Sequence, residues 1–310
     1  MTTETDEKKL LEGYEKYTSG NLKFQKTPGA PGMTKNKSDL EEPDNINKYR
    51  SFVGQLIWYT TKVVPDVANV ARYLALHMSH PGTEHLKALG RLIGYLKGKY
   101  TKGIIIIKTN VLKAVLFCDS NYATYKETRN SVCGLVATLG GTLPTCSSKT
   151  KNTVTLRNTE AEYVDLSACS QEVKFLSMFM VETNKVQNPS VIYEDNQGAI
   201  FLAKNRKVGI STKHIDICHH FLRDMMEEKD INIQYMGSED NPAYILTNNT
   251  SGADFARHMK RITERELWEL VDTRRDNFNK TKFTDDVITH DKTEYSSEAL
   301  TEVVDGKNRN

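Results

Sequence analysis

The sequence predicts an α/β fold, because short apolar runs typical of strands alternate with longer stretches of helical periodicity. Strand-like runs gather in the middle of the chain, and a long helical pattern follows them at about 159–184. The strand-like runs lie at 104–107, 114–117, 131–139, 142–156, 190–194 and 231–236. Periodicity alone gives this class and leaves the arrangement of the strands open.

Turn and break signals separate these elements. Gly140 and Gly141 mark a hairpin, so the strands before and after them are predicted to be antiparallel. Asn188 followed by Pro189 ends the long helix, and shorter helical patterns follow at 197–204, 212–229 and 242–246. The buried face predicted for the long helix consists of Ala161, Tyr163, Val164, Leu166, Ala168, Phe175 and Leu176.

A small helical unit is predicted before the strands. Val53, Leu56 and Ile57 repeat at helical spacing, Pro65 starts a second helix, and Pro81 precedes a third. The ends of the chain are more polar, with turn signals at 27–32 and few apolar residues after about 272. We therefore expect a polar segment at 1–48, a helical region at 49–103, an α/β domain at 104–250, a helix at 251–271 and a disordered tail at 272–310.

Composition restricts the class of protein but not its partner. The 310 residues include 42 basic and 40 acidic side chains, so a nucleic acid would have to meet a local basic surface. The five cysteines are widely spaced without a CxxC pair, which predicts reduced thiols rather than a disulfide scaffold or a zinc site. No apolar stretch approaches the roughly 20 residues of a membrane span, and the first residues are too polar for a signal peptide. We expect an intracellular protein of the cytoplasm or nucleus that does not contact a membrane.

Three acidic residues stand at the ends of predicted elements. Asp119 in LFCDSNY and Asp195 in YEDNQGAI end apolar runs, and Glu160 in NTEAEY opens the long helix. Strand ends and a helix start can converge in an α/β fold, and oxygen ligands suit Mg²⁺ or Mn²⁺. Two such ions about 4 Å apart hold the attacking water and the leaving oxygen of a phosphodiester, which is nuclease chemistry. The alternative for each acid alone is a cap or a turn.

A family resemblance rests on several motifs. TEAEY, followed by DNQGAI, TKHIDICHHFLRD and SEDNPAYILTNNTS, resembles the end of a copia-type retrotransposon Pol polyprotein, with its RNase H domain. The stretch that begins YRSFVGQLIWYTTKVV resembles the connection region between reverse transcriptase and RNase H. Over about 8–270, the resemblance implies an RNase H-like mixed sheet with helices on both faces, preceded by a helical connection region. It also makes 1–48 a remnant of the reverse transcriptase region. The chain has no YxDD motif, so we expect no polymerase active site.

The resemblance also implies a metal site of four carboxylates. Asp119, Glu160 and Asp195 match the first three, and Glu162, about 200° further around the helix, is expected to point away from them. Tyr244 stands where the family has its fourth Asp. A neutral phenol in place of a charged ligand predicts that one of two metal ions, Mg²⁺ or Mn²⁺, binds poorly.

Basic residues are candidates for contacts with nucleic acid. Lys87 and Arg91 lie on the third predicted helix, and Lys213 and Arg223 on a later one. The alternative for all four is a solvated helix face. His214, His219 and His220 lack a second pair of ligands at zinc spacing, so packing is the preferred interpretation.

Three functions follow. The first is a retrotransposon-derived RNase H-like domain that descends from an enzyme cleaving RNA in RNA·DNA hybrids, inactive here if the loss at Tyr244 is decisive. The second is a catalytically dead module or remnant that still binds nucleic acid. The third is an unrelated metal-dependent α/β enzyme. Upstream parts of a Pol polyprotein are expected partners in the first two.

Overall fold

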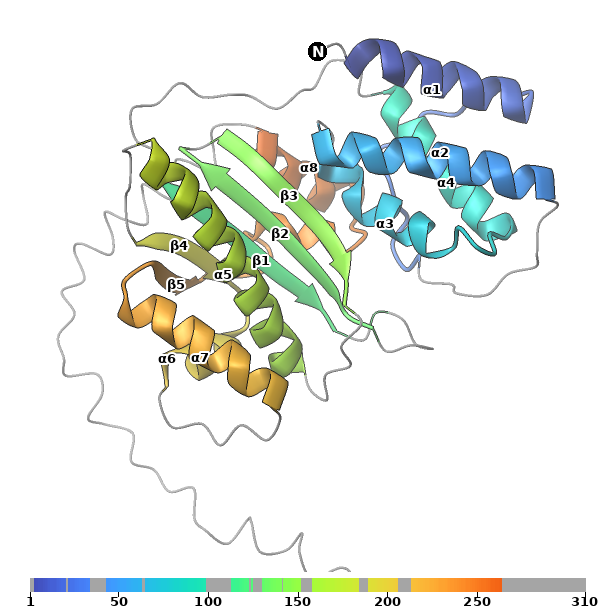
Figure 1. The fold of residues 1–310 in the computed structure, drawn as a ribbon. Coiled ribbons are helices and arrows are strands. Elements are labelled where there is room, and N and C mark those ends of the chain that lie inside the picture. The colour runs from blue at the N-terminus through green and yellow to red at the C-terminus, as the bar shows by residue number, and fades with distance from the viewer. Residues whose placement is uncertain are drawn as a thin grey trace, which may run out of the picture. The chain divides into compact units, whose positions relative to one another are not determined.

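The computed structural model describes most of the chain before residue 264 (Figure 1). The described residues are 3–20, 22–33, 43–62, 65–98, 113–122, 124, 130–140, 142–151, 158–183, 189–205 and 213–263. Met1–Trp268 forms one compact unit, and Glu269–Asn310 is a second. The strand-like run at 104–107, the end of the helix predicted at 251–271 and the tail at 272–310 lie outside the described residues. None of the described helices is both long enough and apolar enough to span a membrane.

Helices make up the first part of the chain. They are α1 (Thr3–Thr18), α2 (Pro43–Lys62), the 3-10 helix η1 (Pro65–Val67), α3 (Ala68–Leu76) and α4 (Thr83–Lys97). The apolar positions that predict these helices form their shared core, in which Val53, Leu56 and Leu74 are completely buried. The Tyr49 hydroxyl donates to the carbonyl oxygen of Leu74 at 2.7 Å and so joins α2 to α3.

The second part is built on a five-stranded mixed sheet. Its strands are β1 (Ala114–Asn121), β2 (Val132–Leu139), β3 (Thr142–Thr150), β4 (Ser190–Glu194) and β5 (Ile231–Tyr235). Their order across the sheet is β3-β2-β1-β4-β5. β1, β2 and β3 pair antiparallel, whereas β4 runs parallel to both β1 and β5. The predicted mixed sheet is confirmed.

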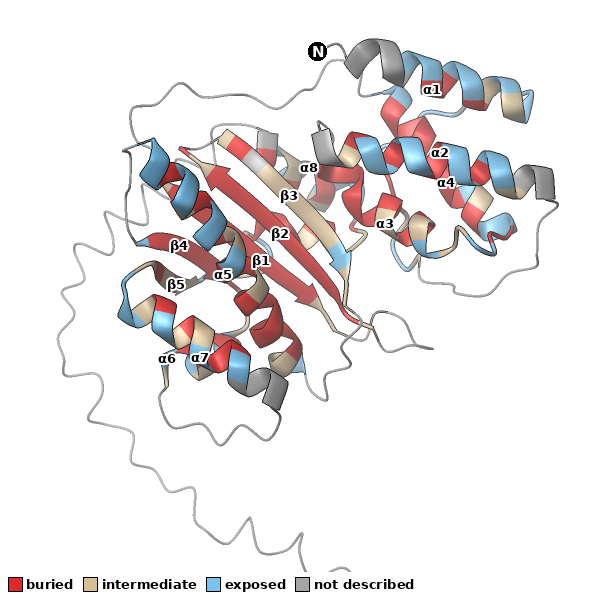
Figure 2. Ribbon diagram, viewed as in Figure 1, coloured by how far each residue is buried: buried red, intermediate tan, exposed pale blue. Residues whose placement is uncertain are grey.

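Helices cover both faces of this sheet, as predicted (Figure 1). One face packs against α5 (Asn158–Glu182), α6 (Gln197–Lys204) and α7 (Lys213–Glu227). The other face meets the 3-10 helix η2 (Pro242–Leu246), beside which lies α8 (Gly252–Thr263). Burial follows this layering, since β1 and β2 are almost wholly buried (Figure 2).

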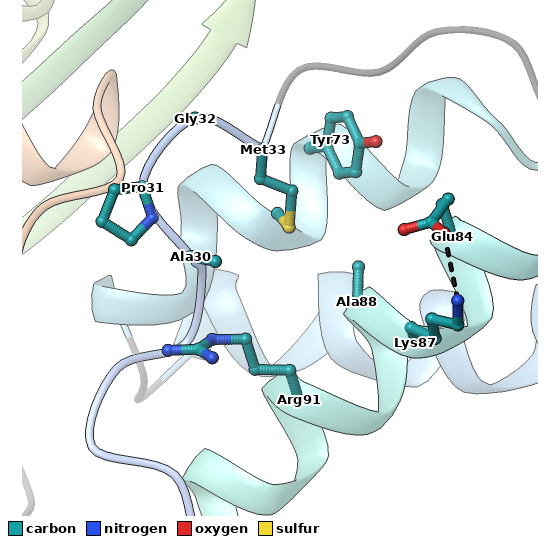
Figure 3. A pocket seen from close by; sticks show the side chains of 9 residues that line it. All are labelled: Ala30, Pro31, Gly32, Met33, Tyr73, Glu84, Lys87, Ala88 and Arg91. Atoms are coloured by element: carbon teal, nitrogen blue, oxygen red, sulfur yellow. Dashed lines mark hydrogen bonds and ion pairs between the residues drawn. The ribbon is translucent and has the colours of Figure 1, made fainter.

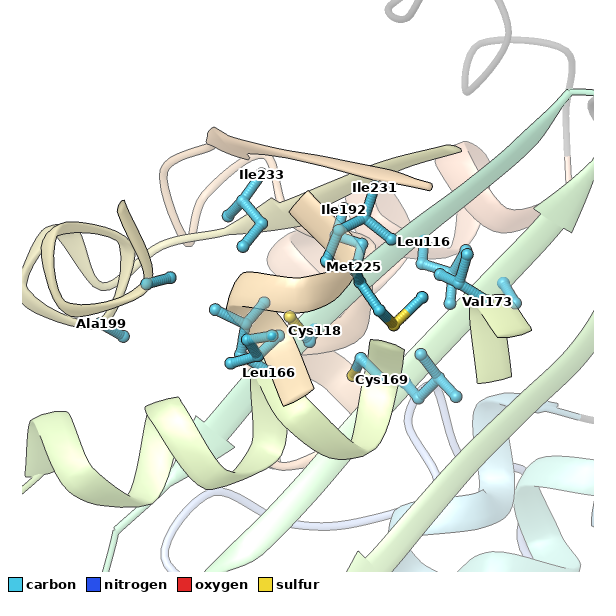
Figure 4. Packing of buried hydrophobic residues seen from close by; sticks show 14 of the residues in the cluster. Leu116, Cys118, Leu166, Cys169, Val173, Ile192, Ala199, Met225, Ile231 and Ile233 are labelled. Atoms are coloured by element: carbon cyan, nitrogen blue, oxygen red, sulfur yellow. The ribbon is translucent and has the colours of Figure 1, made fainter. Parts of the chain in front are cut away.

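The core on the α5 side explains why that helix lies where it does. Leu166, Cys169 and Val173 recur at helical spacing and pack against Leu116 and Ile192 of the sheet (Figure 4). Beyond this stripe the prediction fails for one residue. Phe175 was expected in the buried face and is 66% exposed, because it lies two residues past Val173 and so on the outer side of the helix.

η2 lies unusually close to the sheet, and two residues make this possible. Asn241 caps η2 by accepting from the Ala243 backbone N–H at 3.0 Å, and its amide donates to the carbonyl oxygen of Cys118 in β1 at 2.6 Å. Gly134 in β2 provides the space, because a Cβ there would lie 2.9 Å from both the Ala243 carbonyl oxygen and the Thr247 methyl. The end of η2 is thereby held against the middle of the sheet.

Candidate metal centre

Four carboxylates meet where β1 and β4 end. The parallel pair Phe117–Tyr193 brings Asp119 and Asp195, each two residues further along, to the same edge of the sheet. Glu194, Asp195 and Glu162 of α5 each offer a carboxylate oxygen within 4.8 Å of the others. Asp119 belongs with them, because the charge of Asp195 raises its pKa. We call Asp119, Glu162, Glu194 and Asp195 the carboxylate cluster.

The residue that α5 contributes is Glu162, and not Glu160 as the sequence suggested. Glu162 is 4% exposed and lies on the same stripe as Leu166 and Cys169, whereas Glu160 is partly exposed. The two residues do point in different directions, as expected from their spacing, but the inward one is the second. The apolar stripe of α5, followed back toward its first turn, was the signal that could have identified Glu162.

Burial and mutual repulsion keep this cluster partly protonated when no cation is bound. Burial, followed by the charge of Asp195, raises the pKa of Asp119 to about 7. Burial, followed by the charge of Glu194, raises the pKa of Glu162 to about 11. The pKa of Glu194 is also raised, chiefly by burial. A divalent cation would remove this penalty, because it favours the charged form of every carboxylate around it.

Hydrogen bonds distinguish the members of the cluster. Glu194 has both oxygens engaged, by the Cys118 thiol at 3.0 Å and by the backbone N–H of Asn196 at 3.0 Å. Asp195 accepts from the Ser238 hydroxyl at 2.5 Å. Glu162 Oε2 is buried and has no hydrogen-bond partner among the described residues. An unpartnered buried carboxylate oxygen among oxygen donors fits a hard divalent cation.

A relay of polar side chains orients Asp119 from the opposite side. The Asn121 amide donates to Asn248 Oδ1 at 2.7 Å, and the Asn248 amide donates to the Thr247 hydroxyl at 2.9 Å. Thr247 in turn donates to Asp119 Oδ2. These residues were not selected from the sequence, where Asn and Thr after a strand or a short helix indicate only turns.

Tyr244 lies beside the cluster on η2. It is partly buried, and burial followed by the charge of Asp119 raises its pKa. Its ring packs against His258 of α8, with the ring centroids 5.6 Å apart. The phenol is therefore near the carboxylates and neutral, and its ring is held by an aromatic neighbour.

The basic candidates are scattered. Lys87 pairs with Glu84 at 3.1 Å, and Arg91 donates to the Thr27 hydroxyl at 2.7 Å, both in the helical region. Arg223 on α7 contacts His220 Nδ1 at 2.7 Å. The side chains of Lys213 and His214 lie outside the described part of the chain. His219 is buried, with its ring 6.4 Å from that of Tyr163 and its Nε2 3.3 Å from the Asn205 carbonyl oxygen.

Comparison with known proteins identifies the family. The chain is 30% identical over 252 residues to "Retrovirus-related Pol polyprotein from transposon TNT 1-94" of Nicotiana tabacum, a match that covers 78% of this chain and 19% of that protein. It is 30% identical over 237 residues to the corresponding polyprotein of transposon RE1 from Arabidopsis thaliana, covering 76% of this chain and 16% of the relative. The chain is a homologue of the copia-type retrotransposon Pol polyproteins. It spans less than a fifth of the length of these Pol polyproteins.

Two further comparisons were less informative. No family model matches this Pol homologue. A solved RNase H domain from Mycobacterium tuberculosis, crystallised as a fusion with maltose-binding protein, shares 15% sequence identity with a TM-score of 0.35. That match covers 47% of this chain and 97% of the solved one.

Proposed function

We propose that this chain is the RNase H part of a retrotransposon Pol polyprotein, and that it hydrolyses the RNA strand of an RNA·DNA hybrid with Mg²⁺ or Mn²⁺, at a rate lowered by Tyr244. The observation that carries the proposal is the meeting of Asp119, Glu162 and Asp195 from β1, α5 and the end of β4. Carboxylates alone, at one edge of a mixed sheet, are the donors that phosphodiester hydrolysis with divalent cations requires.

Two bound cations would supply an activated water and neutralise charge on the scissile phosphate. Side chains of the protein orient the carboxylates that would hold these cations. Glu162 offers an oxygen without a competing hydrogen bond, while Ser238 and Thr247 hold one oxygen each of Asp195 and Asp119. Glu194, fixed by the Cys118 thiol and the Asn196 backbone N–H, adds negative charge behind them. Substrate selection would rest on the 2′-hydroxyls and the A-form shape of the hybrid.

Tyr244 sets the expected rate. Its partly buried phenol is electrostatically coupled to Asp119 and Asp195, which supports its assignment to the position of the missing fourth carboxylate. One ligand fewer weakens the binding of one cation, and Mn²⁺ compensates in part because it binds a given ligand set more tightly than Mg²⁺ does.

The test is cleavage of a labelled RNA·DNA hybrid. We expect the unmodified chain to cut slowly, faster with Mn²⁺ than with Mg²⁺, and Tyr244→Asp to cut at least tenfold faster. Asp119→Asn and Glu162→Gln should abolish cutting, whereas Glu160→Gln should not. Cleavage that survives Glu162→Gln would refute the proposed site.

A second function is favoured by Tyr244 itself. If the aromatic contact with His258 has replaced metal binding altogether, the chain is a nucleic-acid-binding module without catalysis. Hybrid binding with no cleavage by either the unmodified chain or Tyr244→Asp, in Mg²⁺ or Mn²⁺, would establish that alternative.

A further inference from the structure

Two adjoining cavities lie beside the helices α3 and α4, and the smaller one extends to the end of β1. The larger has a volume of about 360 Å³ and is lined by α4 and residues 30–33 (Figure 3). The smaller has a volume of about 210 Å³ and reaches Asn121 and Thr247 beside the carboxylate cluster. Gly32, Met33 and Tyr73 line both cavities, so the two cavities adjoin at these residues.

The smaller cavity is rich in hydrogen-bond donors. Its walls include Asn69, Arg72, Asn121, Thr247 and Asn248, each of which also donates to an oxygen of the protein, and no acidic side chain of the described residues lines it. Thr247 separates this donor-rich space from Asp119, with which it shares a hydrogen bond. Amide, hydroxyl and guanidinium groups next to a metal centre suit the phosphates and sugars of a polynucleotide backbone.

The larger cavity combines positive charge with apolar walls. Lys87 and Arg91 stand one turn apart on α4, while Met33 and Tyr73 lie together across the cavity from Arg91 (Figure 3). Arg91 Nε is buried without a hydrogen-bond partner in the described part of the structure. Lys87 is largely exposed, and its ion pair with Glu84 is of the weak surface kind. Tyr73 is buried against His77 and His85 and forms the wall behind Met33. The thioether of Met33 beside two cations can receive a base and its phosphate.

We propose, building on the proposed nuclease function, that the two cavities form one groove that holds a single polynucleotide strand running from the carboxylate cluster to α4. The donor-rich cavity would receive the backbone next to the site. Met33, which is partly exposed, would contact a base, and Lys87 and Arg91 would contact the phosphates of the unpaired strand beyond the duplex. The helical region thereby becomes part of the substrate-binding surface.

The test measures binding without cleavage. The Asp119→Asn chain in EDTA is titrated with fluorescein-labelled RNA·DNA hybrids, one blunt and one with a single-stranded extension, and anisotropy gives the affinities. We expect the extended hybrid to bind about tenfold more tightly. Changing both Lys87 and Arg91 to Gln should remove that preference and lower the log–log salt slope by about 1.4, the amount expected for two phosphate contacts on a single strand.

Two controls isolate the groove. Lys97→Glu makes the same two-unit change of net charge on α4 at a residue that lines neither cavity, and it should keep the preference within twofold. Lys87→Glu alone reverses the charge of an exposed side chain that is not needed for folding. This variant should weaken the binding of the extended hybrid and leave the binding of the blunt hybrid unchanged. Equal binding of both hybrids, or equal losses for the Lys97 and Lys87 variants, would overturn the groove.

Crosslinking and catalysis complete the test. A 4-thiouridine placed in the extension should crosslink to Met33, and crosslinks confined to other faces would contradict the proposal. Because no cleavage is measured, a chain without nuclease activity that still prefers the extended hybrid would refute the proposed enzyme and leave the groove standing. Normal cleavage of the hybrid by the unmodified chain, together with equal binding of the blunt and extended hybrids, would support the proposed enzyme and refute the groove.

Discussion

Helix α5 carries two buried carboxylates one turn apart, and the charges that surround them differ. Asp165, 1% exposed, lies 3.1 Å from the ammonium group of Lys151. Glu162, 4% exposed, faces Glu194 and Asp119, and no cationic side chain of the described residues pairs with it. A buried carboxylate with a structural role is paired with a cationic side chain of the same protein. A buried carboxylate that is surrounded by other acids and has no such partner indicates a site where a cation from solution binds.

The largest effect is expected where the internal cation is removed. Lys151→Met leaves Asp165 buried without its counter-charge and should destabilise the protein by about 3 to 5 kcal/mol at pH 8. Urea unfolding measures the loss, which should shrink as pH falls, because burial raises the pKa of Asp165 and a protonated carboxyl needs no partner. Lys149→Met, two residues before Lys151 at the end of β3 and exposed, is the matched control. Equal losses for the two variants would contradict a structural role for the Lys151–Asp165 pair.

The second effect is a pH dependence of the metal-free protein. The pKa of Asp119 is about 7 when folded, against an ordinary value of 3.8, so the folded state holds a proton that the unfolded state releases. This contribution is complete below about pH 4 and is lost as pH rises toward 7, by roughly 2 kcal/mol between pH 5 and 7. Urea unfolding in EDTA should show the decline. Asp119→Asn should flatten it, and so should 10 mM Mg²⁺. A decline unchanged by Asp119→Asn would place its origin elsewhere.

A smaller effect of opposite sign is expected at Glu162. Because its pKa is raised to about 11, folding at pH 8 requires the uptake of a proton, which Glu162→Gln avoids. The variant should be more stable than the parent in EDTA, while its affinity for Mn²⁺ should fall at least tenfold. Chemical unfolding and Mn²⁺ titration check the two halves. A variant that is both less stable and unaltered in Mn²⁺ affinity would remove Glu162 from the proposed centre.

The smallest effect is expected at Glu160. Its side chain is partly exposed and lies outside the group of carboxylates, so Glu160→Gln should change stability by less than about 0.5 kcal/mol and leave Mn²⁺ affinity unchanged. The same unfolding and titration measurements apply. A fall in Mn²⁺ affinity as large as that of Glu162→Gln would restore Glu160 as the ligand.

Much of this architecture could be predicted because local signals and tertiary packing agree. The strands at β1, β2 and β4 are almost fully buried, and buried strands are the ones that continuous apolar runs identify. The spacing of two residues between Glu160 and Glu162 correctly indicated opposite faces of α5. Which face turns inward depends on packing against Leu116 and Ile192, and no local signal contains that information.

Two kinds of feature were out of reach. Ile57 fits an apolar pattern but is 37% exposed, since periodicity states that positions share a face and not that another element covers it. The relay from Asn121 through Asn248 joins residues 127 positions apart, and a polar residue in a loop gives no sign of its distant partner. Sequence reasoning thus found the strand-end acids and missed the amides that orient them.

Gly134 carries a consequence for judging whether homologues of this chain are active. The absent side chain lets η2 approach the sheet, so Thr247 can reach Asp119. An alanine at this position would push η2 outward and remove the hydrogen bond from Thr247 that orients Asp119, although every carboxylate would still be present. A survey of relatives that counts only acidic residues would classify such a protein as an active nuclease. The greater distance between η2 and the sheet would nevertheless leave Asp119 without its orienting hydrogen bond, and the protein would be inactive.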